Sequence, residues 1–457
     1  MKKIDLVSIA HYAGGRLLRG DGARLATKVS TDSRTSGEGD VFVALVGDKF
    51  DGHQYLKQVS DAGASAVIVS TLPEGWESLS AAVIKVEDTL IGLQRLAENY
   101  RAWHNPFIVG ITGSNGKTST KDLACHIMAA KFQVCATEGN LNNHIGLPLS
   151  ILKLKQGDTC GVFEMGMNHP GEIAPLAAIA APDAAIITNI GVAHIEYMGS
   201  REAIALEKGM LAEAIAQGGV VVLNANDDFT PTIASRCHAR VIQAGIDKGD
   251  VAARNLQVRA DGTSFTLDFS GYTVEAFLPM PGEHMVGNAA LAAAVAWHMG
   301  ITPEQIVAAL ANVKISKGRL ETKQVNGVTF VDDSYNANPD SMKAGLRTLA
   351  GLQSQGRRIA VLGRMGELGT HAEEGHREVG HQAAALGLDA VFTVGAEADL
   401  ISTTASTDNR ALLTAHFPTL ESCAAHLKTE LHPGDLVLLK GSRSSGMERV
   451  LSLYQAS

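Results

Sequence analysis

Short apolar runs alternate with amphipathic helical patterns along the whole chain. Helical spacing is clear over 93–100, where Leu93, Leu96, Ala97 and Tyr100 share one face, and helices are also predicted after residue 117 and over 204–216 and 288–298. Runs rich in Val, Ile and Ala predict strands at 41–45, 66–69, 82–86, 107–111, 134–137, 160–163, 184–190, 220–223, 328–331, 358–362, 390–394 and 435–439. Strands that alternate with helices are typical of α/β proteins with parallel sheets.

The same pattern divides the chain into three predicted domains. Residues 1–86 have the pattern of a small α/β unit, and residues 87–315 form a larger parallel-sheet domain with a small β-rich antiparallel insertion over 251–280. Residues 316–457 have the doubly wound pattern of a Rossmann-like domain. A length of 457 residues agrees with three domains of about 150 residues each.

The first predicted strand of the middle domain runs into a glycine-rich turn, the sequence GITGSNGKTS at residues 110–119. Strand, glycine loop, Lys-Thr and helix is the order of a P-loop, in which backbone N–H groups and a helix N-terminus surround phosphate oxygens. The general pattern would have a glycine where Ile111 stands, and a plain strand-to-helix turn is the alternative interpretation. We expect ATP to contact Gly113, Ser114, Asn115, Gly116, Lys117, Thr118 and Ser119.

Two further residues have the chemistry of a nucleotide site, and the pattern around a third, Lys208, does not indicate one. Glu164 ends a predicted buried strand, where a carboxylate needs a cation, and beside a P-loop that cation is Mg²⁺, although chance placement is the alternative. His194 follows another strand end, where α/β sheets bind ligands, and it is equally well explained as a hydrogen-bonded structural histidine. From its pattern alone, Lys208 is predicted to be a solvated lysine on a helix.

Composition narrows the class of protein. The net charge is −9, and acidic and basic residues are interspersed, which argues against a nucleic-acid-binding surface. The five cysteines form no CxxC pair, so no zinc pattern or disulfide framework can be read. The chain starts MKKIDL, with an acid where a signal peptide needs an apolar run, and has no span of about 18 apolar residues. We therefore expect a cytoplasmic protein without membrane insertion.

An ordered set of motifs spans the chain. It comprises T-D-S-R and F-V-A-L-x-G-x-x-F-D-G-H near the start, then T-G-S-N-G-K-T-S, G-N-L-N-N-x-I-G-x-P, N-H-x-G-E-I, G-R-L, D-D-S-Y-N-A-N-P-x-S-M and K-G-S-R. In this set the chain resembles the Mur ligases of bacterial cell-wall synthesis, whose P-loop also lacks the first glycine. One departure is Arg364, where relatives often carry Asp.

The resemblance implies a role for each domain and for single residues. The first domain would bind the UDP-sugar, the second ATP and Mg²⁺ at two sites, and the third would close over the nucleotide. Arg319 would contact the γ-phosphate, Asn288 the adenine and Asp333 the ribose. Metal ligands would be Thr118, Glu164, His194 and Lys208, the last as a carbamylated lysine. The catalytic set would be Lys117, Lys208, His194 and Arg319, and the UDP-sugar substrate would meet Ser33, Arg34, Asp48, Asn140, Asn142 and Asn143.

The resemblance also implies a reaction. An ATP-dependent amide ligase would add D-Ala-D-Ala to UDP-MurNAc-tripeptide through an acyl phosphate, as a monomer acting on small molecules. The alternative is a Mur or folylpolyglutamate-type ligase that adds a single amino acid, but G-N-L-N-N and Asn338-Pro339 favour the dipeptide, and no D-N-P-R run is present. A P-loop switch or motor is a third interpretation, and the absence of N-K-x-D weakens its GTPase form.

Overall fold

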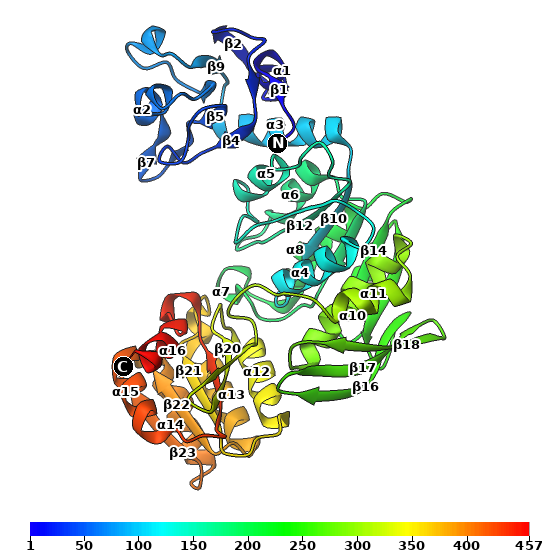
Figure 1. Cartoon of the computed structure of the whole chain (residues 1–457), viewed down its shortest axis with the longest axis vertical. Coiled ribbons are helices and arrows are strands. Elements are labelled where there is room, and N and C mark those ends of the chain that lie inside the picture. The colour runs from blue at the N-terminus through cyan, green and yellow to red at the C-terminus, as the bar shows by residue number, and fades with distance from the viewer. Residues whose placement is uncertain (457) are drawn as a thin grey trace.

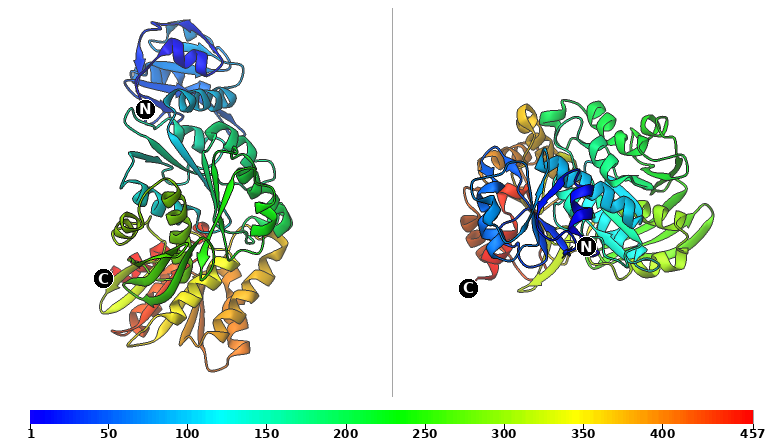
Figure 2. Two further views of the ribbon diagram at one scale, coloured as in Figure 1. Left: turned by 90° about the vertical axis from the view of Figure 1, so that its right-hand side faces the viewer. Right: turned by 90° about the horizontal axis from the view of Figure 1, so that it is seen from above.

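The computed structural model describes residues 1–456 and shows three α/β domains in chain order (Figure 1). Each domain is built around one main sheet, of five, nine and six strands respectively. The molecule is elongated, with the N-terminal domain at one end and the central domain between the other two (Figures 1 and 2). The predicted fold class is therefore confirmed. No helix within residues 1–456 is long and apolar enough to cross a membrane.

The N-terminal domain has four parallel strands and one antiparallel edge strand. In spatial order they are β2 (Arg16–Arg19), β9 (Ala82–Lys85), β8 (Ala66–Val69), β5 (Asp40–Val43) and β4 (Lys28–Ser30). Around them lie α1 (Leu6–Tyr12), α2 (Leu56–Asp61) and two strand pairs, β1 (Ile4–Asp5) with β3 (Leu25–Ala26) and β6 (Val46–Gly47) with β7 (Phe50–Asp51). The helix α3 (Thr89–His104), capped by the Asp88 side chain, connects this domain to the next.

The central sheet places the P-loop strand between two parallel neighbours. Its order is β11 (Val134–Ala136), β12 (Cys160–Glu164), β10 (Phe107–Thr112), β13 (Ala184–Ile187), β14 (Val220–Asn224), β15 (Arg240–Ile246), β16 (Val251–Arg259), β17 (Gly262–Phe269) and β18 (Tyr272–Leu278). Its helices are α4 (Lys117–Met128), α5 (Gly146–Ile151), α6 (Ile173–Ala180), α7 (Ile195–Met198), α8 (Arg201–Glu213), α9 (Thr230–Ala234), α10 (Glu283–His298) and α11 (Pro303–Leu310). Because β10, β12 and β13 are parallel, the residues after their carboxyl ends meet at one edge.

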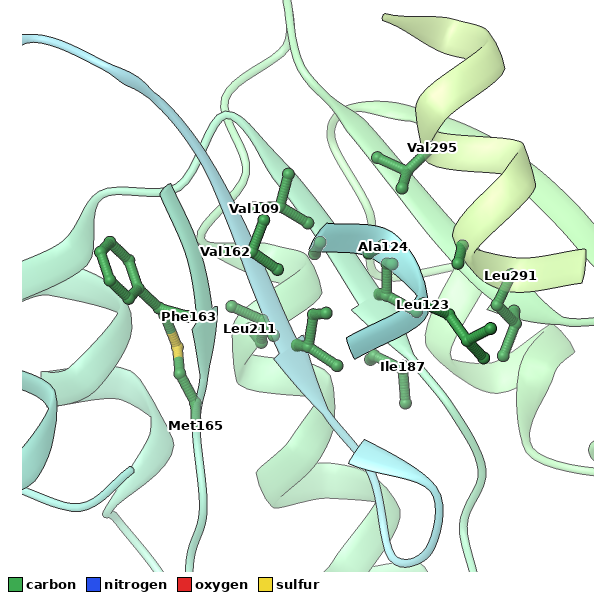
Figure 3. Packing of buried hydrophobic residues seen from close by; sticks show 14 of the residues in the cluster. Val109, Leu123, Ala124, Val162, Phe163, Met165, Ile187, Leu211, Leu291 and Val295 are labelled. Atoms are coloured by element: carbon green, nitrogen blue, oxygen red, sulfur yellow. The ribbon is translucent and has the colours of Figure 1, made fainter. Parts of the chain in front are cut away.

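Helices cover both faces of this sheet (Figure 3). Leu123 of α4 and Leu291 of α10 pack on one face, and Phe163, Met165 and Leu211 lie on the other. Each such side chain contributes about 1.5–3 kcal/mol by leaving water. The apolar runs predicted as strands are thus buried on both sides, and they hold the P-loop on a rigid support.

The β-rich segment predicted as a small insertion is continuous with the central sheet. β16 pairs parallel with β15, and β17 and β18 then add two antiparallel strands at the edge. The side chains of β17 alternate between buried and half-buried, as expected for a strand with one covered face.

The C-terminal domain is a doubly wound sheet with helices on both faces. Its strand order is β19 (Glu321–Val325), β20 (Val328–Asp333), β24 (Leu436–Lys440), β21 (Arg358–Gly363), β22 (Ala390–Val394) and β23 (Leu413–Phe417). Its helices are α12 (Pro339–Gly351), α13 (Ala372–Ala385), α14 (Asp399–Asp408), α15 (Leu420–Glu430) and α16 (Glu448–Gln455). All pairs except β19 with β20 are parallel, so β20, β21 and β24 also end at one edge.

Candidate active site

A cavity of about 1430 Å³ lies where the strand ends of the central domain face those of the C-terminal domain. Its lining residues run from Ser114 to Ser444, so within the described chain the N-terminal domain contributes nothing to this cavity. The cavity contains every predicted P-loop residue from Ser114 to Ser119. Strand ends of two facing α/β sheets are a usual place for a ligand.

The P-loop glycines are required by their surroundings. Gly113 has φ of +149°, and a Cβ there would lie 1.8 Å from the Thr188 hydroxyl. Gly116 precedes α4 with φ of +80°, and a Cβ there would lie 2.6 Å from the side-chain oxygen of Asn288. Both positions are closed to larger residues, which keeps the loop backbone open toward the cavity.

Lys117 folds back over this loop. Its Nζ donates to the carbonyl of Gly113 at 2.8 Å, and burial lowers the pKa of Lys117 more than the nearby Glu164 raises it. The loop itself is fixed by Asn189, whose Oδ1 accepts from the backbone N of Asn115 at 2.9 Å. Sequence reasoning missed Asn189, although its place at the end of a predicted strand beside the P-loop was a usable signal.

Glu164 lies next to the P-loop threonine. Its Oε2 accepts from the Thr118 hydroxyl and its Oε1 from Asn142 Nδ2, both at 2.9 Å, and only 3% of the residue is exposed. Arg319, from the segment that enters the C-terminal domain, donates to the Thr118 hydroxyl at 2.9 Å. A carboxylate, a hydroxyl and two cationic side chains therefore meet at the mouth of the P-loop, which suits a phosphate with a bound cation.

Lys208 is buried, in contrast to the solvated lysine that its pattern predicted. It has no exposed surface, and its Nζ has no hydrogen-bond partner within the described residues. Burial lowers the pKa of Lys208 well below its usual value, and the charge of Lys117 lowers it further. The prediction was wrong because Lys208 lies on the apolar stripe of α8, together with Ile204 and Leu211. The spacing of these three residues in the sequence could have indicated that Lys208 is buried.

His194 joins the two domains across the cavity. It precedes α7 with φ of +64°, and its Nδ1 lies 2.7 Å from Oε2 of Glu367 in the C-terminal domain. The contact with the His194 ring lowers the pKa of Glu367. Two more contacts cross here, from Asn338 to the P-loop residue Asn115 at 2.8 Å and from the Val192 backbone to Asp340 at 3.0 Å.

The other nucleotide residues predicted line the same cavity. Asp333, at the end of β20, pairs with Lys440 of β24 at 2.5 Å. The guanidinium of Arg319 stacks over the Tyr335 ring at 4.2 Å, and Asn288 of α10 faces Gly116. Arg364 also lines the cavity and pairs with Glu397 at 2.9 Å. Of these partners, Gly116, Tyr335 and Lys440 belong to motifs named in the sequence, whereas Glu397 does not.

Comparison with known proteins agrees with this arrangement. Three family models match in succession: the Mur ligase family catalytic domain at residues 26–101, the Mur ligase middle domain at 111–296 and the Mur ligase glutamate ligase domain at 318–443. UDP-N-acetylmuramoyl-tripeptide–D-alanyl-D-alanine ligases of Bacillus subtilis and Escherichia coli are both 36% identical to the chain. The matches cover 93% of this chain, with 92% and 93% of those proteins.

The chain belongs to the Mur ligase family. Solved structures agree: the MurF structure from Acinetobacter baumannii superposes with a TM-score of 0.92 at 30% identity over 100% of both chains. A MurF ligase from Thermotoga maritima, solved in complex with ADP, gives a TM-score of 0.85 at 30% identity and covers 94% of this chain and 97% of that one.

The substrate residues predicted for this Mur ligase lie in two places. Asn140, Asn142 and Asn143 line the cavity, and Oδ1 of Asn143 also accepts from the backbone N of Gly146, the first residue of α5, at 2.8 Å. The other three do not line the cavity and lie on loops of the N-terminal domain: Ser33, Arg34 and Asp48.

Arg34 and Asp48 are exposed, and Arg34 is held in place. Its Nε and Nη2 contact Asp32 at 2.9 and 2.8 Å, and this pair lowers the pKa of Asp32 to about 2. A fixed guanidinium on an open loop can meet a phosphate.

Within the described residues, no three His, Cys, Asp or Glu side chains gather as a metal site. The metal ligands predicted for this Mur ligase nevertheless include the hydroxyl of Thr118, and threonine is not one of these four residue types. Thr118 and Glu164 do lie together, 2.9 Å apart, and the partnerless amine of Lys208 is buried close enough for its pKa to respond to Glu164. A carbamate on that amine would add two oxygens, so the residues fit Mg²⁺.

Proposed function

We propose that this Mur ligase joins the terminal carboxylate of UDP-MurNAc-tripeptide to the amine of D-Ala-D-Ala, using ATP, in peptidoglycan precursor synthesis. The observation that carries the proposal is the cluster of Lys117, Thr118, Glu164 and Arg319 at the mouth of the P-loop. Whole-length similarity to enzymes with that name supports the choice of substrates.

Each domain has a part in this reaction. We assign residues 1–86 to the UDP-sugar, 87–315 to ATP and 316–457 to closure and the amine. ATP and a UDP-linked precursor are substrates that a cytoplasmic enzyme would meet.

The first step transfers the γ-phosphoryl group of ATP to the carboxylate. A carboxylate oxygen forms the new bond to phosphorus as the bond to the ADP oxygen breaks, and negative charge develops on the transferring group. Lys117 and Arg319 are placed to neutralise that charge. Mg²⁺, held by Thr118, Glu164, His194 and carbamylated Lys208, would screen the phosphates when bound.

The second step forms the amide. The dipeptide amine attacks the acyl carbon, phosphate leaves from the tetrahedral intermediate, and the nitrogen loses a proton. The acyl phosphate is also open to attack by water. The C-terminal domain contacts the P-loop through Asn338 and the backbone of Val192 through Asp340, and this cover would shield the intermediate from solvent.

The test is phosphate release from ATP and Mg²⁺ with UDP-MurNAc-tripeptide, with and without D-Ala-D-Ala. Release that requires the dipeptide, with a pentapeptide product by mass, supports the proposal. Release with a single amino acid on a shorter precursor, and none with the dipeptide, would assign the chain to another step of the pathway.

A further inference from the structure

The carboxylate of Asp122 holds the segment that carries Arg319. Asp122 stands on α4, one turn after Thr118, and its Oδ2 accepts from both the backbone N and the hydroxyl of Ser316, at 2.9 and 2.7 Å. Only 13% of the Asp122 side chain is exposed, whereas Ser316 lies at the surface. An exposed linker is thus attached to the P-loop helix by two hydrogen bonds to a mostly buried charge.

The other carboxylate oxygen of Asp122 is connected to the active site through a chain of contacts. Asp122 Oδ1 lies 2.9 Å from the Nζ of Lys121, which is buried and donates to the carbonyl of Thr137 at 2.9 Å. The hydroxyl of Thr137 accepts from the backbone N of Glu164 at 3.0 Å. The attachment point is therefore tied to the strand end that presents Glu164.

Beyond Ser316 the linker has a fixed shape. Gly318 and Leu320 both have left-handed backbone angles, with φ of +71° and +54°, and Leu320 is buried. A bulky residue holds such an angle only where its surroundings impose it. The carbonyl of Gly318 also accepts from the backbone N of Tyr335 at 3.1 Å. Arg319 sits between these two residues, so the anchor at Ser316 sets where its guanidinium can reach.

We propose that Asp122 is a positioning residue that places Arg319 at the γ-phosphate. The contacts close a ring: Asp122 holds Ser316, Arg319 contacts Thr118, Thr118 contacts Glu164, and Glu164 returns to Asp122 through Thr137 and Lys121. The inference rests on the proposed ATP site. It assigns to Asp122 the alignment of the central and C-terminal domains at the P-loop.

The test compares nucleotides with and without a γ-phosphate. Calorimetry measures the Kd of ADP and of a non-hydrolysable ATP analogue, both with Mg²⁺, for the unaltered enzyme and Asp122→Ala. We expect the Kd of the analogue to rise about 10-fold, the lower range for a charge-assisted hydrogen bond, while the Kd of ADP stays within about 2-fold. In an Arg319→Ala background, Asp122→Ala should add no further loss, because it acts through Arg319.

Two variants separate positioning from folding. Ser316→Ala keeps the Asp122–Lys121 pair. It should raise the Kd of the ATP analogue without changing that of ADP, and the rise should be smaller than in Asp122→Ala. The control is Lys314→Ala, an exposed linker residue with no ion pair or side-chain hydrogen bond within residues 1–456. The inference would be overturned if Asp122→Ala weakened the binding of ADP and of the analogue equally, or if neither Asp122→Ala nor Ser316→Ala changed the Kd of the analogue. It would also be overturned if Asp122→Ala caused the same loss of affinity in the Arg319→Ala background. If neither nucleotide binds the unaltered chain, the proposed function itself fails.

Discussion

At the scale of single residues, Lys208 has the least usual environment in the active site. A buried amine without a partner costs free energy, and its lowered pKa favours the neutral form that can react with CO₂ to give a carbamate. We predict that Lys208→Met loses about 100-fold in turnover, the scale of one lost electrostatic contact in an active site. Its free energy of unfolding should be unchanged or about 1 kcal/mol higher, because an apolar chain replaces the amine.

Chemical rescue distinguishes the carbamate from the amine. A short carboxylic acid should restore part of the activity of Lys208→Ala, because it supplies the missing carboxylate, while an alkylamine should not. Full activity of Lys208→Ala without any additive would remove the carbamate from the mechanism.

Lys117 gives a second residue-scale prediction. Lys117→Ala should abolish turnover, because the γ-phosphoryl group loses one of the two cations proposed to neutralise its charge, while binding of the UDP substrate changes by less than about 2-fold. The Arg34 loop lies on another domain, so titration of the UDP substrate by fluorescence or calorimetry separates the two sites. Near-normal turnover would contradict the P-loop assignment.

Some site residues were predictable because their signal is local. Lys117 follows an apolar strand and a glycine turn, and Glu164 ends a buried strand, so neighbouring sequence suffices for both. Lys208 could have been found from its apolar stripe on α8. Asn189 could likewise have been found from its place at the end of a predicted strand beside the P-loop. Glu367 carries no local signal, since only the folded structure gives it a partner in the other domain.

At the scale of elements, the turn between β10 and α4 depends on its glycines. Gly113→Ala would bring a Cβ onto the Thr188 hydroxyl at a φ that L residues rarely adopt. We predict at least about a 10-fold rise in the Kd for ATP, since a small misplacement of the loop amides weakens phosphate binding. Gly218→Ala is the matched control, because a Cβ there meets no atom within 4 Å. Equal ATP affinity in the two variants would contradict this account of the loop.

Strands with a high apolar content were predicted from the sequence, whereas more polar strands were not. The central strands are buried on both faces and stand out as apolar runs, as β13 and β14 do. The strand β2 reads Arg-Leu-Leu-Arg with no buried residue, and it was missed because its pairing, not its composition, defines it. The link between β15 and β16 was also missed, since sheet continuity depends on register.

At the scale of the whole molecule, the site is made by contacts that no sequence pattern encodes. Arg319 is 201 residues from Thr118, and Asn338 is 223 residues from Asn115. Their meeting depends on how the C-terminal domain sits on the central one. The motif set suggested that these residues belong to one site, and the geometry shows which atoms meet.

The domain contact should respond to pH through Glu367. The contact with His194 lowers the pKa of Glu367 from its ordinary value of 4.5. The stabilisation that the ionised Glu367 gives to the domain contact is therefore fully present above pH 4.5, and it is lost as the pH falls through the lowered pKa. We predict that the radius of gyration from small-angle scattering stays constant from pH 7 down to about pH 4.5 and increases as the pH falls further, through the lowered pKa of Glu367. Glu367→Gln should already be expanded at pH 7.

Glu373→Gln is the control for this experiment, because Glu373 pairs with Arg377 on the same helix and takes no part in the domain contact. A Glu367→Gln protein as compact as the unaltered enzyme, with the same response to pH, would show that this pair does not hold the domains together.

The most direct test of the central claim follows one oxygen atom. UDP-MurNAc-tripeptide labelled with oxygen-18 in its terminal carboxylate is incubated with ATP, Mg²⁺ and D-Ala-D-Ala, and the released phosphate is analysed by mass. If the cluster at the P-loop activates the carboxylate as an acyl phosphate, one labelled oxygen appears in each phosphate, and release depends on the dipeptide. Unlabelled phosphate would mean that water attacks ATP, and the proposed mechanism would be wrong.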